Sequence, residues 1–147
     1  MSAGLRRLHR DEDGQAMVLV AIFLLGLVAV AGLVADGGMV LAQRRDLQNV
    51  ADAAAAAGAM QLDESVYRAS GGEDVSLDEA AAYSAAVGYL SAEDGITYAV
   101  NATVARVEVQ VSRGASTAFL RVLGIDSVTI SASAAAEPRH GVVAAVR

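Results

Sequence analysis

The sequence of 147 residues contains no cysteine and no lysine, and it has a single proline. Without cysteine the chain can form neither a disulfide nor a thiolate metal site. The only two histidines, His9 and His140, lie near opposite ends of the chain, which excludes a site that needs both. Aromatic residues make up only 4% of the chain, so we expect a core built mostly from alanine and valine.

Positive charge is also scarce. All 11 basic residues are arginine, against 17 acidic residues, and the net charge is −6. The first fifteen residues are neutral overall, so the acidic excess lies downstream of them. An acidic body has no electrostatic attraction for nucleic acid or anionic lipid headgroups, and we expect no nucleic-acid partner.

What the sequence does have is a long apolar run at residues 16–35, without a single charge. A helix needs about 20 residues to cross a hydrocarbon core of roughly 30 Å. The Leu, Val, Ile and Phe residues of the run favour membrane insertion by about 4 to 7 kcal/mol. The run is apolar on every side, whereas a core helix of a small soluble protein shows a polar stripe. It therefore predicts a transmembrane helix.

A cleaved signal peptide is the alternative, because Ala29-Val30-Ala31 fits an A-x-A cleavage site. The acidic triplet at residues 11–13 and the continuation of the run beyond Ala31 both argue against it. We favour a retained anchor. Three arginines precede the run closely, and Arg44 and Arg45 follow it at a distance, which predicts a cytoplasmic N-terminus and an extracytoplasmic head. Asp36 would be costly and functional inside the membrane, but we place it at the outer edge, where it ends the span.

Helical spacing of apolar residues and a run of alanines extend the helix beyond the membrane, so we predict one helix over 15–61. Residues 63–75 resemble a loop. Ser76 and Glu79 match a capping box, which predicts a helix over 77–91. Alternation of period two predicts strands at 96–104 and 107–112, with a hairpin turn near Ala105, and a third strand at 128–134. A short helix at 116–123, with Phe119 facing inward and Gly124 closing it, is expected between the last two strands.

These elements predict an α+β fold with a three-stranded antiparallel-type sheet, short helices and a long N-terminal helix. We expect a cytoplasmic tail (1–15), a transmembrane helix (16–35), a helical stalk (36–62), an extracytoplasmic head (63–137) and a flexible tail (138–147).

No motif of a catalytic, nucleotide or metal site is present in the sequence, so we expect neither an enzyme nor a cofactor. Small residues four apart allow close helix packing, and the candidates are Ala31, Ala35, Gly38, Ala42, Ala54 and Gly58. Asp36, Arg44 and Arg45 are candidate partner contacts.

Three stretches, DEDGQAMVLVAIFLL, GLVADGG and LAQRRDLQNVADAAAAAGA, carry a resemblance to the TadG/TadE-like proteins that assemble Flp pili in the tight-adherence system. The resemblance covers the first 60 residues and is looser beyond them. It implies a single-pass, pilin-like or scaffolding membrane protein of a pilus-assembly or secretion apparatus. Its partners would be membrane lipid and other pilus-assembly proteins or pilin-like subunits.

Type IV-like pilins are cut after a glycine and carry a glutamate at the fifth mature position. Gly14 is the matching cut site here, with Gln15 as the first mature residue, but the fifth is then Leu19. This departure favours an anchored assembly factor over a polymerising subunit. An envelope-anchored binding or sensing module unconnected to pili, and a secreted protein cleaved near Ala31, remain as alternatives.

Overall fold

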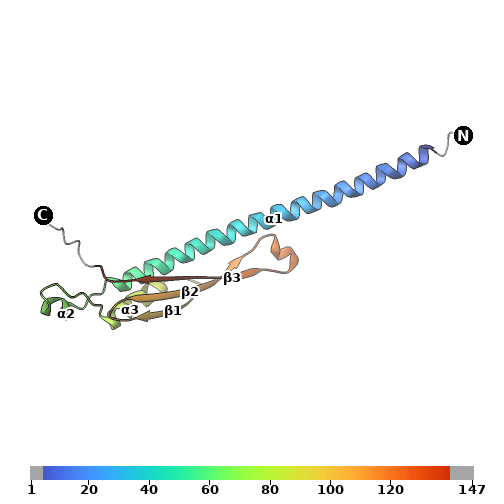
Figure 1. The fold of residues 1–147 in the computed structure, drawn as a ribbon. Coiled ribbons are helices and arrows are strands. Elements are labelled where there is room, and N and C mark those ends of the chain that lie inside the picture. Colours follow the sequence, from blue (N-terminus) through green and yellow to red (C-terminus); the bar gives the residue numbers. More distant parts are fainter. Residues whose placement is uncertain (1–4, 140–147) are drawn as a thin grey trace, which may run out of the picture. The chain divides into compact units, whose positions relative to one another are not determined.

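The computed structural model describes residues 5–139, with side chains from residue 14 onward except that of Leu123. The chain is α+β, as predicted, with a long apolar N-terminal helix, a small antiparallel sheet and short helices (Figure 1). In order, the elements are α1 (Leu5–Ala59), α2 (Glu64–Ala69), α3 (Glu79–Leu90), β1 (Thr97–Ala102), β2 (Val107–Ser116), the 3-10 turn η1 (Leu120–Leu123) and β3 (Ser127–Ala136).

The chain divides into two compact units. The first contains the residues of α1 up to Met39 together with the segment Thr117–Asp126. The second contains Val40–Ser116 and the chain from Ser127 onward. The apolar run and the sheet therefore belong to different units, although α1 contributes to both.

The first unit contains the apolar run as part of α1. Within the described residues, α1 is the one helix that is long and apolar enough to cross a membrane. Its large apolar side chains from Met17 to Val34 are between 51% and 77% exposed. The protein thus offers almost no cover for these side chains, as expected for a helix whose solvent is lipid.

The second unit is built on a sheet in the order β1-β2-β3, antiparallel throughout. The predicted hairpin is confirmed: Thr103 donates its N–H to the carbonyl of Arg106 at 2.9 Å, which closes the turn between β1 and β2. From Val107 to Val111 in β2 and from Ile130 onward in β3, more buried residues alternate with more exposed ones, because successive side chains point to opposite faces of a sheet.

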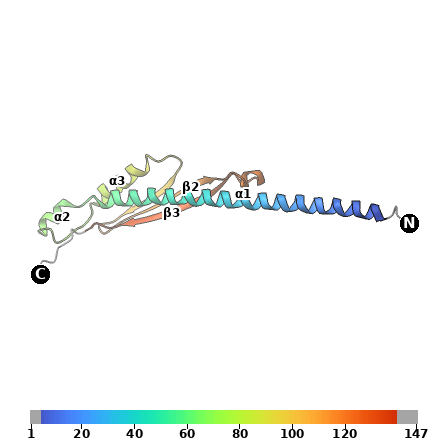
Figure 2. The ribbon, with the colours of Figure 1, turned by 90° about the horizontal axis from the view of Figure 1, so that it is seen from above.

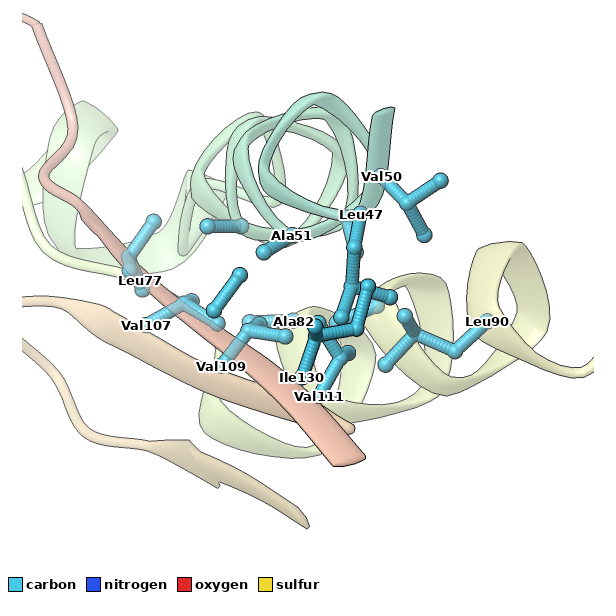
Figure 3. Close-up of a cluster of buried hydrophobic side chains, with 14 of the residues drawn as sticks. Leu47, Val50, Ala51, Leu77, Ala82, Leu90, Val107, Val109, Val111 and Ile130 are labelled. Atoms are coloured by element: carbon cyan, nitrogen blue, oxygen red, sulfur yellow. The ribbon is translucent and has the colours of Figure 1, made fainter. Parts of the chain in front are cut away.

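The core of the second unit lies between one face of the sheet and two helices, the C-terminal part of α1 and α3 (Figures 1 and 2). Figure 3 shows Leu47 and Ala51 of α1 directed toward the valines of β2. The side chains are small, as the composition predicts, and the largest fully buried apolar residues are Leu47, Leu77, Leu90, Val107 and Val109.

Three local predictions are wrong. Residues 64–69 form α2 rather than loop, because the carboxylate of Asp63 accepts the N–H groups of Ser65 and Val66 and caps a helical turn. The predicted capping box does not form. Instead Asp78 caps α3 by accepting the N–H of Ala81 at 3.0 Å.

The side chain of Glu79, predicted to bond back to Ser76, accepts the N–H of Val104 at 3.0 Å. The third error concerns the predicted helix at 116–123. Ser116 ends β2, and only Leu120–Leu123 form a helical turn, with Gly124 at its end as predicted, at φ 84°. Phe119 is half exposed rather than buried.

Candidate functional site

Asp36 of α1 is the centre of the most specific arrangement in the first unit. Its side chain is 1% exposed, although it directly follows the apolar run. The carboxylate accepts three consecutive backbone N–H groups from the segment between β2 and β3: Ala118 at 2.8 Å, Phe119 at 3.0 and 3.1 Å, and Leu120 at 2.6 Å. A single aspartate thus fixes a segment more than eighty residues away in sequence.

We call residues 117–126 the capped loop (Figure 1). The two ends of the loop are bonded to each other and form its base: Thr117 donates its N–H to the backbone carbonyl of Asp126 and its hydroxyl to the carbonyl of Ile125. Above this base, η1 ends at Gly124, whose left-handed backbone suits glycine. The loop is therefore a compact unit with its own hydrogen bonds.

The position of Asp36 follows from the electrostatics of η1. No side chain of the loop itself caps this turn, so its first N–H groups need another acceptor. The Asp36 carboxylate supplies one and lies where the N–H groups place partial positive charge. Burial raises the pKa of the Asp36 carboxyl, but the N–H groups of Leu120, Ala118 and Phe119 lower it by more, so the pKa lies below its ordinary value.

Apolar contact joins the same two segments one helical turn before Asp36. Gly32 faces the ring of Phe119 so closely that a Cβ on Gly32 would lie 2.7 Å from the ring carbons. Next to this contact lies a hollow of about 520 Å³ lined only by apolar residues. They are Leu25, Val28, Ala29, Val30 and Leu33 of α1 and Phe119, Leu120 and Val122 of the capped loop.

The structure separates the six small residues that the sequence nominates for helix packing. Ala31, Ala35, Gly38 and Ala42 are exposed, whereas Ala54 is fully buried in the core of the second unit. A Cβ on Gly58 would lie 2.9 Å from the Ala82 carbonyl of α3. The last pair of the series therefore packs inside the chain, and the first four residues are open to lipid or a partner.

The other nominated residues are exposed. Gly14 and Gln15, the candidate processing position, lie within α1. Arg44 and Arg45 are exposed, and neither forms an ion pair with any residue that the structure describes. Arg44 lines a hollow of about 560 Å³ with Gln48 and polar residues of the sheet, including Tyr98 and Gln110.

Among the described residues, no group of three acidic or histidine side chains could hold a metal ion. The side chains of His9 and His140 lie outside the described part of the chain. The expectations that the protein has no metal, no cofactor and no enzymatic activity stay predictions.

Sequence reasoning singled out Asp36 but missed its partner. The capped loop contains no sequence motif that identifies it, and a sequence does not show where its backbone N–H groups point. The available signals were Gly32, one turn before the acid, and the apolar character of Phe119 to Ile125 in a connection between two polar-faced strands.

Comparison with known proteins supports the resemblance over the first part of the chain. Residues 14–61 match the Tad family, described as Flp pilus-assembly TadE/G-like. No curated protein and no solved structure matches the chain. The match begins at the candidate processing glycine and ends just after α1, so it includes Asp36, both arginines and all six small residues. Residues 14–61 are thus similar to TadE/G-like Flp pilus-assembly proteins, and this similarity supports involvement of the chain in pilus assembly.

Proposed function

We propose that the protein is a membrane-anchored, non-enzymatic component of a Tad/Flp-type pilus-assembly or secretion apparatus, with a scaffolding or minor pilin-like role. One observation carries this proposal: the matched domain coincides with a helix whose first half is apolar and uncovered and whose second half enters a folded core. Such a helix would connect a membrane anchor to a folded domain within one continuous element.

The helix supports retention in the membrane rather than secretion. Cleavage near Ala31 would remove Leu25, Val28 and Val30, which line the apolar hollow beside the capped loop. Of the α1 residues that line the hollow beside Phe119 and Val122, a folded secreted product would then keep only Leu33. The contacts of the capped loop thus favour an anchor that is not cleaved near Ala31.

The partners in this proposal are membrane lipid and other pilus-assembly membrane proteins or pilin-like subunits. The exposed small residues Ala31, Ala35, Gly38 and Ala42 would let another helix approach α1 closely. Arg44 and Arg45 would meet acidic groups of a partner beyond the bilayer. Leu19 at the fifth position after Gly14 favours the scaffold over the polymerising subunit.

The test is deletion of the gene in its host, complemented by the unchanged chain or by Arg44→Glu with Arg45→Glu. Deletion should abolish Flp pili on the cell surface, and the unchanged chain should restore them. The reversed charges should restore fewer pili at equal membrane levels, whereas Gly88→Ala, a change on the exposed side of α3, should restore them fully. Normal pili after deletion would contradict the proposal and favour an envelope-anchored sensing or binding module.

Two further measurements divide the remaining alternatives. The mass of the mature N-terminus separates an uncut anchor, which begins at Met1 or Ser2, from processing at Gln15 and secretion from Gly32. The presence of the protein in sheared filaments would identify a minor subunit, whereas its confinement to the membrane fraction would identify a scaffold.

A further inference from the structure

The capped loop presents apolar side chains outward, which is unusual for a connection between two strands. Val122 is 85% exposed, Phe119 50% and Ile125 45%, and Leu120 is partly covered. We call these four residues the crown. They surround η1 and lie in the same compact unit as the apolar run of α1.

The contacts of the crown with α1 give its level along the helix. The apolar hollow that the crown lines extends from Leu33 to Leu25, and Asp36 holds the base of η1. At about 1.5 Å per residue, the distance from Asp36 to Leu25 is roughly 16 Å along the axis. One leaflet contributes about half of a hydrocarbon core of roughly 30 Å. If residues 16–35 span the bilayer, the crown lies beside the part of α1 that one leaflet surrounds.

An irregular loop at that level needs partners for its backbone, because hydrocarbon offers none. The capped loop meets this requirement for most of its backbone N–H groups. Backbone N–H groups of seven of its residues are bonded, three to Asp36 and four to carbonyls of the loop. They belong to Thr117, Ala118, Phe119, Leu120, Val122, Gly124 and Ile125.

The charged residues of the loop are compatible with the same position. Arg121 pairs with Asp126 at the base, with 3.4 Å between its Nε and a carboxylate oxygen, and its side chain is 64% exposed. A long arginine side chain can extend along apolar surface and keep its guanidinium in the headgroup layer.

We propose that the capped loop inserts its crown into the bilayer leaflet nearest the folded domain, alongside α1. Acyl chains of lipid are the occupants of the crown surface. The inference rests on the proposed membrane anchoring, because it takes residues 16–35 as the span. It adds a second membrane contact. In this contact Asp36 accepts three backbone N–H groups of the inserting loop, which would otherwise have no hydrogen-bond partner in hydrocarbon.

The observations favour lipid over a second copy of the chain as the partner of the crown. The crown continues an α1 surface that is apolar on all sides, so lipid that surrounds the helix also reaches the crown. Neither charge complementarity nor a matching groove on the described residues indicates a second copy.

The chain has no tryptophan, so one introduced tryptophan reports on a single position. Val122→Trp places it on the crown, and Ile125→Trp is a second crown variant in case the first disturbs the loop. Phe23→Trp marks the apolar run, and Tyr83→Trp marks α3 in the second unit. Each full-length variant is reconstituted in phosphatidylcholine vesicles whose acyl chains carry bromine, a quencher, at a shallow or a deep carbon.

We expect both crown variants to emit at shorter wavelength than Tyr83→Trp and to lose most emission with shallow bromine. Phe23→Trp should lose most emission with deep bromine, and Tyr83→Trp should be unaffected by either. If Phe23→Trp is quenched and both crown variants are not, the crown does not enter lipid and this inference is wrong, while the anchor stands. If Phe23→Trp is not quenched either, the proposed anchoring itself fails. A third outcome is that the emission of the crown tryptophans lies at short wavelength, is not quenched by bromine, and returns to longer wavelength when the protein is diluted with lipid. That outcome would identify a second copy as the occupant and overturn the proposal.

Discussion

At the scale of single residues, Asp36 shows how a buried charge is held without a cation. Among the described residues it is the only charged side chain that is buried. The ion pairs are exposed at least on one side, including Arg113 with Asp46, and such pairs contribute little to stability. Asp36 instead has three backbone donors, and hydrogen bonds to an ionised group are the stronger kind. The loop therefore depends on one carboxylate.

Replacement of Asp36 by asparagine tests this dependence. An amide has one oxygen to accept N–H groups, and its own NH₂ would face donors, so the loop should open. We expect exchange of the Ala118 to Leu120 amides to accelerate on the order of tenfold or more, measured by mass spectrometry in detergent. Asp46→Asn, a change at an exposed carboxylate, is the control and should leave these amides protected. Unchanged exchange in Asp36→Asn would contradict the role of the carboxylate.

The same carboxylate predicts a pH dependence of the loop. Because the pKa of Asp36 is lower in the folded chain than its ordinary value near 3.9, its stabilising contribution is complete above that pH. The contribution is lost as the pH falls through the folded pKa. Protection of the Ala118 to Leu120 amides should therefore be constant from neutral pH to about 4 and decrease below it. A decrease that begins near neutral pH would point to a different titrating group.

At Gly58 we expect alanine to lower the stability of the protein, which is opposite to its usual effect in a helix. Alanine in place of glycine usually stabilises a helix by about 1 kcal/mol. At Gly58 the new Cβ would lie 2.9 Å from the Ala82 carbonyl and 3.0 Å from Val107, so α1 would be forced away from α3 and β2. We expect Gly58→Ala to lower the free energy of unfolding by about 1 to 3 kcal/mol.

The matched control for Gly58→Ala is Gly88→Ala in α3, where a Cβ meets no atom within 4 Å. It should raise the stability by about 0.5 to 1 kcal/mol. Thermal unfolding of both variants, followed by circular dichroism in the same detergent, gives the comparison. Equal stabilisation by the two changes would show that α1 and α3 do not pack as closely as described.

At the scale of elements, α3 is capped by a different residue from the one that the sequence predicts. The sequence favours Ser76 as the cap, whereas Asp78 accepts the N–H of Ala81. Asp78→Ala should destabilise the protein by about 0.5 to 2 kcal/mol. Ser76→Ala should change the stability by less than about 0.5 kcal/mol, because Ser76 contributes its backbone carbonyl to Asp63 rather than a side-chain bond. Urea unfolding of the two variants decides between the caps. A larger loss of stability in Ser76→Ala than in Asp78→Ala would support the capping box instead.

The strands and α1 could be predicted from the sequence because their signals are periodic. Alternation from Val107 to Val111 and from Ile130 to Ala134 marks one more buried face in each strand, and the paired register places those residues side by side. The errors fall where structure depends on one side chain in a specific place. Asp63 converts a glycine-containing loop into α2, and Asp36 replaces a local cap for η1. Contacts across such sequence distances have no periodic signature.

At the scale of the whole molecule, the two halves of α1 lie in different environments. Its first half is exposed to whatever surrounds the chain, and its second half supplies Leu47, Val50 and Ala51 to the core. The matched TadE/G-like domain includes both halves but ends before the sheet begins. The sheet and α3 are thus the part that completes the core of the second unit, and the matched domain is the part that connects this core to the apolar run.

The predicted orientation follows from arginines on either side of the apolar run, and the absence of cysteine makes it testable. Ser2→Cys and Ser91→Cys each introduce the only thiol, one before the run and one after α3. Because Arg6, Arg7 and Arg10 predict a cytoplasmic N-terminal side, we expect a membrane-impermeant maleimide to label Ser91→Cys in intact spheroplasts and Ser2→Cys only after lysis. Labelling of Ser2→Cys alone in intact spheroplasts would show that the orientation is the opposite of the predicted one. Labelling of both before lysis, with the protein in the soluble fraction, would mean that the apolar run does not span the bilayer.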